Sequence, residues 1–210
     1  MSVPGEWTEI TDDAALTALV GEPVARVREK VRPALTALDR DWLAASAFCV
    51  VATADAEGNC DASPKGDPAG DLVYVLDDRT IALAERPGNR RVDGYRNILR
   101  NPHVGLIFVI AGRGDTLRVN GRARLIADAP FLDEMAVRGR RPIMALVVEI
   151  DEVFHHCSKA FLRSKLWRPA TWRPDAVPER AVIAKAMERP DDDLSELQRY
   201  YGPSYAEKLY

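Results

Sequence analysis

Short apolar segments joined by turns of hairpin length constrain the fold of this 210-residue chain more than any other feature. They are rich in β-branched residues and lie beside Gly, Pro, Asn or Asp, as is typical of strands. The main ones are AFCVVATA (47–54), TIALAE (80–85), HVGLIFVI (103–110) and IMALVVEIDEVFHH (143–156). Parallel strands need crossovers of about a dozen residues or more, and most connections here are shorter. The chain is therefore predicted to be an antiparallel β-barrel, mainly β with peripheral helices, built from about six or seven strands.

Three further segments complete the predicted set of strands. CDASP returns after the hairpin signal DAEGN, LVYVLDD precedes TIALAE, and TLRVNGRARLIA spans 116–127. The last alternates cleanly, because Leu117, Val119, Gly121, Ala123 and Leu125 share one face. Its other face carries arginines without interleaved aromatic residues. We interpret that face as solvated or as a subunit contact rather than as a nucleic-acid stripe.

Helical patterns flank these strands. Residues 12–46 are predicted to form two helical pieces that place Val31, Leu35, Leu38, Trp42 and Leu43 near one face, with Pro33 early in the second piece.

Shorter helices are predicted after Asn89, at about 129–138 and over SKAFLRSKLW, and two amphipathic helices in the tail. The chain is thus divided into an N-terminal helical segment (1–46), a barrel domain (47–170) and a C-terminal helical extension (171–210).

Charge and cysteine usage limit the classes of partner. The net charge of −3 gives no nucleic-acid signature, although the stretch from Arg79 to Arg124 holds ten arginines and three acids. That imbalance favours a small anionic ligand. Three cysteines without a C-x-x-C motif indicate buried, unpaired thiols and a reducing compartment. The N-terminus does not resemble a signal peptide and no apolar run reaches about 18 residues, so we expect a cytoplasmic protein without membrane spans.

The stretch ERPGNRRVDGYRNILRNP (85–102) predicts an anion site. If Asn89 is the N-cap of a helix, the first-turn amides and the helix dipole face the same region as Arg90 and Arg91. Two guanidinium groups at that end suit a phosphate monoester. The alternative is a solvated arginine pair. Ser63 and Lys65 can add a hydroxyl and an ammonium, although ordinary turn chemistry explains them equally well.

Other chemistry is disfavoured by the motifs. The sequence lacks the G-x-G-x-x-G, P-loop and G-x-S-x-G signatures. His155, His156 and Cys157 invite a metal interpretation, but adjacent residues on a strand point to opposite faces. With His103 as the one further histidine, we predict no metal site.

Taken together, these segments resemble the pyridoxamine 5'-phosphate oxidase-like FMN-binding proteins with a split β-barrel, and most closely their uncharacterised bacterial FMN-dependent subgroup. The resemblance covers about residues 40–170. It rests on CDASPKGD, TIALAERPGNRRVDGYRNILRNPHVGLIF, GRGDTLRVNGRARL and HCSKAFLRSKLW followed by PATW.

The resemblance implies a set of FMN-binding residues, with the cofactor between the two subunits of a homodimer. Asp61, Ala62, Ser63 and Lys65 would lie along the isoalloxazine and ribityl chain, and Asn89, Arg90 and Arg91 would hold the phosphate. Thr116 and Leu117 would reach FMN from the partner chain. Lys159, Arg163, Ser164 and Trp167 would close the pocket, with a place inside a core helix as the alternative for Trp167.

The resemblance also implies an FMN-dependent oxidoreductase acting on a small organic substrate, and we assign no catalytic residue. The C-terminal segment with which pyridoxamine phosphate oxidases grip their substrate is not recognisable, so that reaction is not our interpretation. A non-catalytic flavin-binding store or sensor is the alternative. Related split barrels bind F420 or haem, and a haem would use His155 or His156 as its axial ligand.

Overall fold

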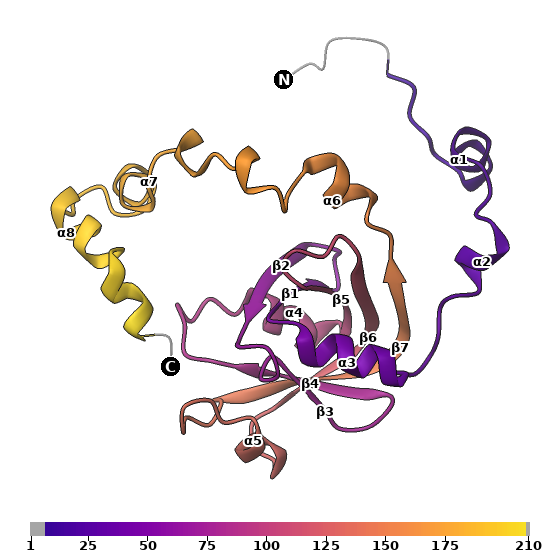
Figure 1. Cartoon of the computed structure of the whole chain (residues 1–210), viewed down its shortest axis with the longest axis horizontal. Helices are drawn as coiled ribbons and strands as arrows, with labels where there is room; N and C mark the ends of the chain where they lie inside the picture. The colour runs from indigo at the N-terminus through magenta and orange to yellow at the C-terminus, as the bar shows by residue number, and fades with distance from the viewer. Residues whose placement is uncertain (1–6, 209–210) are drawn as a thin grey trace. The chain divides into compact units, whose positions relative to one another are not determined.

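In the computed structural model, which describes residues 7–208, seven strands form one sheet in the order β2-β1-β5-β6-β7-β4-β3. The strands are β1 (Phe48–Ala54), β2 (Cys60–Gly66), β3 (Val73–Val75), β4 (Thr80–Glu85), β5 (His103–Val109), β6 (Thr116–Ile126) and β7 (Met144–His156). Every pairing is antiparallel. The sheet curls on itself and leaves β2 and β3 as its two edges (Figure 1). The predicted antiparallel barrel is confirmed, in its split form.

The hairpin between β1 and β2 forms for local reasons. Asp55 Oδ1 accepts hydrogen bonds from the backbone amides of Glu57 and Asn59, at 3.0 and 2.8 Å. Gly58 takes a φ of 86°, a left-handed conformation that glycine adopts without steric cost. The turn sets the register, so Cys49, Val51 and the residues two apart from them face the interior.

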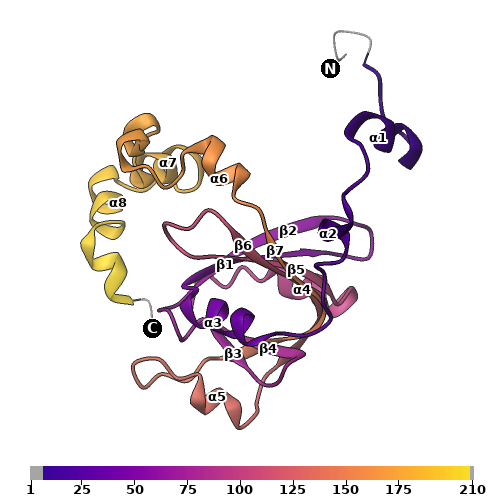
Figure 2. The same cartoon turned by 45° about the vertical axis from the view of Figure 1, so that its right-hand side comes forward.

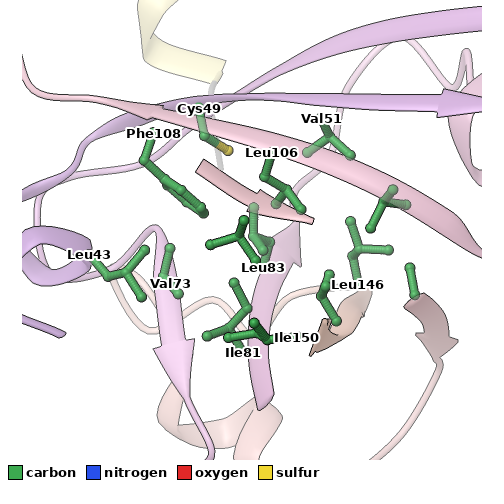
Figure 3. Packing of buried hydrophobic residues seen from close by; sticks show 14 of the residues in the cluster. Leu43, Cys49, Val51, Val73, Ile81, Leu83, Leu106, Phe108, Leu146 and Ile150 are labelled. Atoms are coloured by element: carbon green, nitrogen blue, oxygen red, sulfur yellow. The ribbon is translucent and has the colours of Figure 1, made fainter. Parts of the chain in front are cut away.

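The barrel interior is filled by side chains from opposite walls. Figure 3 shows Cys49, Val51, Leu106 and Phe108 of β1 and β5 facing residues of β4 and β7. The facing residues are Ile81, Leu83, Leu146 and Ile150. All of these are buried, which is the expected result of alternating apolar strands curled about one core.

A bulge in β6 depends on a glycine. The register between β6 and β7 shifts at Asn120 and Gly121. A Cβ atom at Gly121 would lie 2.0 Å from the backbone oxygen of Glu149, closer than any real side chain allows. The strand therefore bends where two backbones approach each other.

The helices are α1 (Asp13–Val20), α2 (Ala25–Arg28), α3 (Ala37–Ala45), α4 (Asp93–Arg100), α5 (Phe131–Glu134), α6 (Lys159–Ser164), α7 (Arg180–Met187) and α8 (Leu194–Tyr200), with short 3-10 turns at Pro169–Thr171, Pro174–Ala176 and Pro203–Lys208. Two compact units divide the chain, residues 1–31 and 32–210. In the first unit, α1 is capped at its N-terminus by Asp12, whose Oδ1 accepts from the amide of Ala15. Gly21, with a φ of 80°, is its C-cap.

The prediction of two helical pieces over 12–46 was only partly right. Three helices form instead, and Arg32 pairs with Val153 as an isolated β-bridge. Pro33 explains the break, because the residue before a proline disfavours the helical conformation. Of the residues predicted to share one face, Leu35, Trp42 and Leu43 are buried, whereas Val31 and Leu38 are 36% and 75% exposed.

Within the second unit, α3 is held by a capping box. Thr36 Oγ1 accepts from the amide of Asp39, and the Asp39 carboxylate accepts from the amide of Thr36. Helix α5 covers the outer side of β4 and β7, where Leu132 and Met135 are buried against Ala145 (Figure 2). In the tail, α7 and α8 form their own small core from Ala181, Ala184 and Leu197, so the two amphipathic tail helices are confirmed.

Candidate functional site

A cavity of about 480 Å³ opens between β2, the end of β4 and the start of α4. Its floor includes Val51 and Thr53 on the inner face of β1. A volume of this size lies within the range of about 300–1,000 Å³ that is usual for small-molecule sites. It is the candidate functional site.

Strand β2 supplies one wall. Its alternate residues Asp61, Ser63 and Lys65 are half-buried on the cavity side, while Ala62 and Pro64 are exposed on the opposite face. All five line the cavity, so Ala62 contributes through its backbone. The structure thus brings together the four residues of β2 that, by the family resemblance, would lie along the flavin ring and ribityl chain.

Two ion pairs connect the walls of the cavity. Lys65 Nζ lies 2.6 Å from Glu85 Oε2, and Arg86 Nε lies 2.9 Å from Asp67 Oδ2. Lys65 lies on β2 and Asp67 directly follows that strand. Glu85 is the last residue of β4 and Arg86 directly follows it. Strands β2 and β4 are not neighbours in the sheet, so both ion pairs span the split of the barrel.

A tyrosine completes a hydrogen-bonded cluster at Lys65. The ammonium of Lys65 donates to Tyr95 Oη at 2.6 Å, and the hydroxyl of Tyr95 donates to Glu85 Oε2. Burial, and then the hydrogen bond to Glu85, raise the pKa of Tyr95 far above its usual range. Burial also raises the pKa of the neighbouring Cys49 thiol to about 12, although Lys65 pulls in the opposite direction. Tyr95 and Cys49 are therefore neutral at physiological pH.

Helix α4 packs closely against β1 and β2. Asn97 Nδ2 donates to Thr53 Oγ1 at 3.1 Å, and a Cβ atom at Gly94 would lie 2.9 Å from Asp61 Oδ2. The absence of a side chain at Gly94 therefore allows the first turn of α4 to approach the cavity wall.

The predicted N-cap at Asn89 is wrong. Helix α4 begins at Asp93, after Val92, and not directly after Asn89. Asn89 Oδ1 instead accepts from the amide of Arg91 at 2.9 Å, a local turn that competes with helix formation. Arg90 has a φ of 62°, which also departs from a helical path. The N-terminus of α4 therefore lies after Arg90 and Arg91, and neither arginine is in its first turn as the sequence argument assumed.

The two arginines also differ in their surroundings. Arg91 and Asn89 line the cavity, whereas Arg90 does not. Arg91 Nε lies 2.6 Å from Asp93 Oδ2 in an exposed ion pair. The pKa of Arg91 is raised by the hydrogen bond and charge of Asp93, and further by Asp61.

The cavity is not the basic centre that the arginine count predicted. Its lining carries four carboxylates and three cations, and each of those cations has a carboxylate partner. The remaining arginines of the basic stretch lie elsewhere, on β6 and on other exposed surfaces, because neighbours in sequence alternate between faces.

Thr116 and Leu117 do not line the cavity of their own chain. Thr116 is buried, and Leu117 has no exposed surface and belongs to the barrel core. The Leu117 side chain is thus enclosed in its own chain, which leaves only its backbone to meet FMN bound to a partner. Its apolar alternation faces the interior of its own barrel.

The four C-terminal candidates also lie outside the cavity in this chain. Lys159, Arg163 and Ser164 are exposed on α6. Trp167 follows that helix and is not part of a core helix. Its Nε1 donates to the backbone oxygen of Arg113 at 2.6 Å. Together with Phe161, it lines a second cavity of about 150 Å³ beside the β5–β6 loop.

His155 and His103 each contact a polar side chain. His155 Nε2 lies 3.2 Å from the buried Asp39 carboxylate, and its ring packs edge-on against Trp42. His103 Nδ1 contacts Asn101 Oδ1 at 2.7 Å. Across residues 7–208, no three His, Cys, Asp or Glu side chains are grouped to hold a metal ion. The three cysteines are unpaired as predicted, but only Cys49 is buried, so the expectation of three buried thiols is wrong.

Sequence reasoning missed the acidic and aromatic side of the site. Asp67, Glu85, Arg86, Asp93 and Tyr95 all line the cavity. The one local signal is that Glu85 and Arg86 directly follow a buried strand, where polar side chains often mark a site. Their pairing with β2 depends on the order of strands in the sheet.

Several solved structures are similar to this chain. HupZ of Group A Streptococcus is 22% identical over 58% of this chain and 93% of its own, with a TM-score of 0.46. A candidate pyridoxamine 5'-phosphate oxidase from Lactobacillus delbrueckii is 24% identical over 59% of this chain and 95% of its own, with a TM-score of 0.47. An F420 reductase is 15% identical over 56% of this chain and 94% of its own, with a TM-score of 0.40. None of the curated proteins compared with the chain matches it.

The family itself is settled by a sequence profile rather than by these structures. The profile of the pyridoxamine 5'-phosphate oxidase family matches residues 35–157, which is more than half of the chain. The matched region contains the whole cavity, from β1 to α4, and ends just after β7. This chain therefore belongs to the pyridoxamine 5'-phosphate oxidase family.

Proposed function

We propose that the cavity binds FMN and that the protein is an FMN-dependent oxidoreductase acting on a small organic substrate. The family generally binds flavin. The observation that carries the proposal is that Asp61, Ser63, Lys65, Asn89 and Arg91 converge on one cavity of about 480 Å³. These are residues that the sequence alone had selected for FMN.

The donor set of the cavity suits the parts of FMN. Arg91 and the side-chain amide of Asn89 provide donors for a phosphate monoester, with Arg90 adjacent in the chain. Ser63 and Lys65 can donate to a carbonyl-rich ring edge, and Asp61 can accept from ribityl hydroxyls. Val51, Leu72 and Ile98 add apolar surface for an aromatic ring.

The chain's own residues would bind and orient the cofactor. When bound, FMN supplies reversible two-electron chemistry at its ring. The Lys65–Glu85–Tyr95 cluster holds the Lys65 ammonium in one position. The apolar floor excludes water from that side of the ring. A flavin enzyme of this kind needs no dedicated acid or base from the protein, and we name none.

We propose further that the protein is a homodimer with FMN at the subunit interface. The outward face of β2, β1 and β5 is apolar, although this is the solvent side of the single chain. Its residues are Phe48, Val50, Ala52, Ala62, Pro64, Ile107 and Val109. Phe48 and Ile107 are 42% and 40% exposed. A continuous apolar sheet face favours burial against a second copy, and Thr116, Lys159, Arg163, Ser164 and Trp167 could then reach the partner's cavity.

The absorption spectrum of the purified protein tests the cofactor directly. We expect flavin bands, or their appearance with a shifted maximum when FMN is added. FMN should bind much more tightly than riboflavin, because each charge-assisted hydrogen bond to the phosphate is worth roughly 1.5–3 kcal/mol. Equal affinities for FMN and riboflavin would contradict a phosphate site.

The same samples distinguish the proposed enzyme from two alternatives. A flavin store or sensor would bind FMN without turnover, so reduction by NADH or NADPH followed by reoxidation with an acceptor distinguishes an enzyme from a store. A Soret band would instead indicate haem. His155 and His156 do not line the cavity, and His155 contacts Asp39, which favours flavin over haem in that cavity.

The location of the protein is likewise a proposal. No helix among the described residues is both long and apolar enough to cross a membrane. Cys49, Cys60 and Cys157 are all free thiols, and the last two are exposed. Exposed free thiols are typical of a reducing compartment, so we propose the cytoplasm.

A further inference from the structure

We propose that Asp93 is an internal competitor for the ligand's phosphate, and that it sets how strongly the cavity prefers a phosphorylated flavin through Arg91 alone. The inference rests on the proposed flavin function and assigns unequal roles to the two neighbouring arginines. It begins from the pairing of every cation in the cavity lining with a carboxylate. An entering phosphate therefore competes with a carboxylate for each of these cations.

The three ion pairs differ greatly in exposure. The side chains of Arg86 and Asp67 are 11% and 3% exposed, and those of Lys65 and Glu85 are 16% and 21% exposed. Separating either pair would leave a charge in a poorly solvated place. The side chains of Arg91 and Asp93 are 79% and 37% exposed. Water can solvate both of these partners when they part, so Arg91 is the exchangeable cation.

The geometry at Arg91 favours exchange rather than simple addition. Its Nε already donates to Asp93 Oδ2 at 2.6 Å, and its backbone amide donates to Asn89 Oδ1. A carboxylate in this position occupies the Nε–H, one of the five guanidinium donors, and so competes with a phosphate oxygen for the bidentate edge that includes Nε. The negative charge of Asp93 also repels a dianionic phosphate that approaches the same guanidinium.

Arg90 is a natural comparison for Arg91. It is exposed, has a φ of 62° and does not line the cavity. Phosphate recognition should therefore depend on Arg91 much more than on Arg90, although the two side chains carry the same charge and are adjacent.

The test measures the dissociation constants of FMN and riboflavin by fluorescence titration of full-length variants. The pH is held at about 7.5, above the second phosphate pKa of about 6. In D93N, we expect FMN to bind about three- to fivefold more tightly while riboflavin changes less than twofold, because an exposed ion pair contributes a factor of this size. R91A should bring FMN affinity close to that of riboflavin, and R90A should cost FMN affinity far less. In the R91A background, D93N should lose most of its effect.

D115N is the matched control. Arg113 and Asp115 form another exposed pair with one residue between them, the Asp115 side chain is also 37% exposed, and neither residue lines the cavity. D115N removes one negative charge, as D93N does, but at a residue that does not line the cavity. It should therefore leave the preference for FMN over riboflavin unchanged. An equal rise in D115N would mean a general charge effect and would overturn the inference.

The remaining outcomes also decide the matter. A preference for FMN that is unchanged or lower in D93N, with a native circular dichroism spectrum, overturns the competitor role while leaving flavin binding intact. Equal losses in R90A and R91A overturn the assignment to Arg91. No binding of either flavin by the native protein overturns the proposed function, and this inference with it.

Discussion

Lys65 on β2 contacts Glu85 at the end of β4, with Nζ and Oε2 2.6 Å apart, although four strands stand between β2 and β4 in the sheet. The contact crosses the split of the barrel. The neighbouring Asp67–Arg86 pair also crosses it. The same two ion pairs therefore shape the cavity and join two strands that share no backbone hydrogen bonds.

The buried ion pair across the split should matter more for stability than the exposed one beside it. D67N leaves Arg86, with an 11% exposed side chain, without its ion partner Asp67, and we expect a loss of about 3–5 kcal/mol in the free energy of unfolding. D93N breaks the exposed ion pairs of Asp93 with Arg91 and Arg96 and should cost less than about 1 kcal/mol. Urea unfolding of both variants measures the difference. Equal losses would show that the split is not held by Asp67.

Asp39 makes stability depend on pH. Burial raises the pKa of Asp39, but hydrogen bonds from Thr36 and Arg32 outweigh it, so the pKa is lowered in the folded state. A lowered carboxyl pKa stabilises the fold above the unfolded value of about 3.9, and this contribution is lost as pH falls through the folded value. The free energy of unfolding should fall below about pH 4 in the native protein. D39N should be less stable at neutral pH and show a flatter decline, and an identical pH dependence in both proteins would contradict this role.

The three cysteines should react at very different rates. Cys49 has no exposed surface and its thiol pKa is about 12, whereas Cys60 and Cys157 are exposed. At about pH 8, a thiol reagent should modify two groups quickly and the third only after denaturation. Mass spectrometry after partial labelling identifies them. Rapid labelling of Cys49 in the folded protein would mean that β1 opens locally.

Gly121 should be far less replaceable than Gly105, although both lie on neighbouring strands. A Cβ at Gly121 would meet the backbone of Glu149 at 2.0 Å, whereas a Cβ at Gly105 would meet only the Asn120 side chain, at 3.4 Å. G121A must displace backbone and should cost roughly 2–4 kcal/mol, in the range of overpacked cores. G105A should change stability by less than about 1 kcal/mol. Thermal melts compare them, and similar melting temperatures would refute the close approach.

The proposed homodimer is best tested at Ile107, not at Leu117. Ile107 is 40% exposed on the apolar outer face, while Leu117 is fully buried in its own barrel. I107D should give a folded monomer of about half the native mass in sedimentation, because a charge on that face prevents its burial. L117D should lose its folded circular dichroism signal, because it places a charge in the core. A native protein that already sediments as a monomer would rule out the dimer.

Local sequence patterns were sufficient for most of the secondary structure. The alternation of Leu117, Val119 and Ala123 predicted the buried face of β6, and TIALAE predicted β4 with the observed bounds. These features depend on residues within one element, where side-chain periodicity and backbone geometry are coupled. The antiparallel arrangement followed from connection length alone. Of the β2 residues that line the cavity, Ser63 and Lys65 were noted from the sequence itself, whereas Asp61 and Ala62 came only from the family resemblance.

Tertiary structure decided the charge and the boundaries of the site. Asn89 was predicted to begin a helix, but its side chain bonds to the amide of Arg91 and the helix starts at Asp93. Glu85 meets Lys65 only because the sheet curls until β2 and β4 face each other, and no local pattern reports the order of strands. Sequence by itself therefore determined which residues could bind an anion. The fold determined which of those cations already hold a carboxylate, because ion pairing depends on distance in space and on exposure to water rather than on separation along the chain.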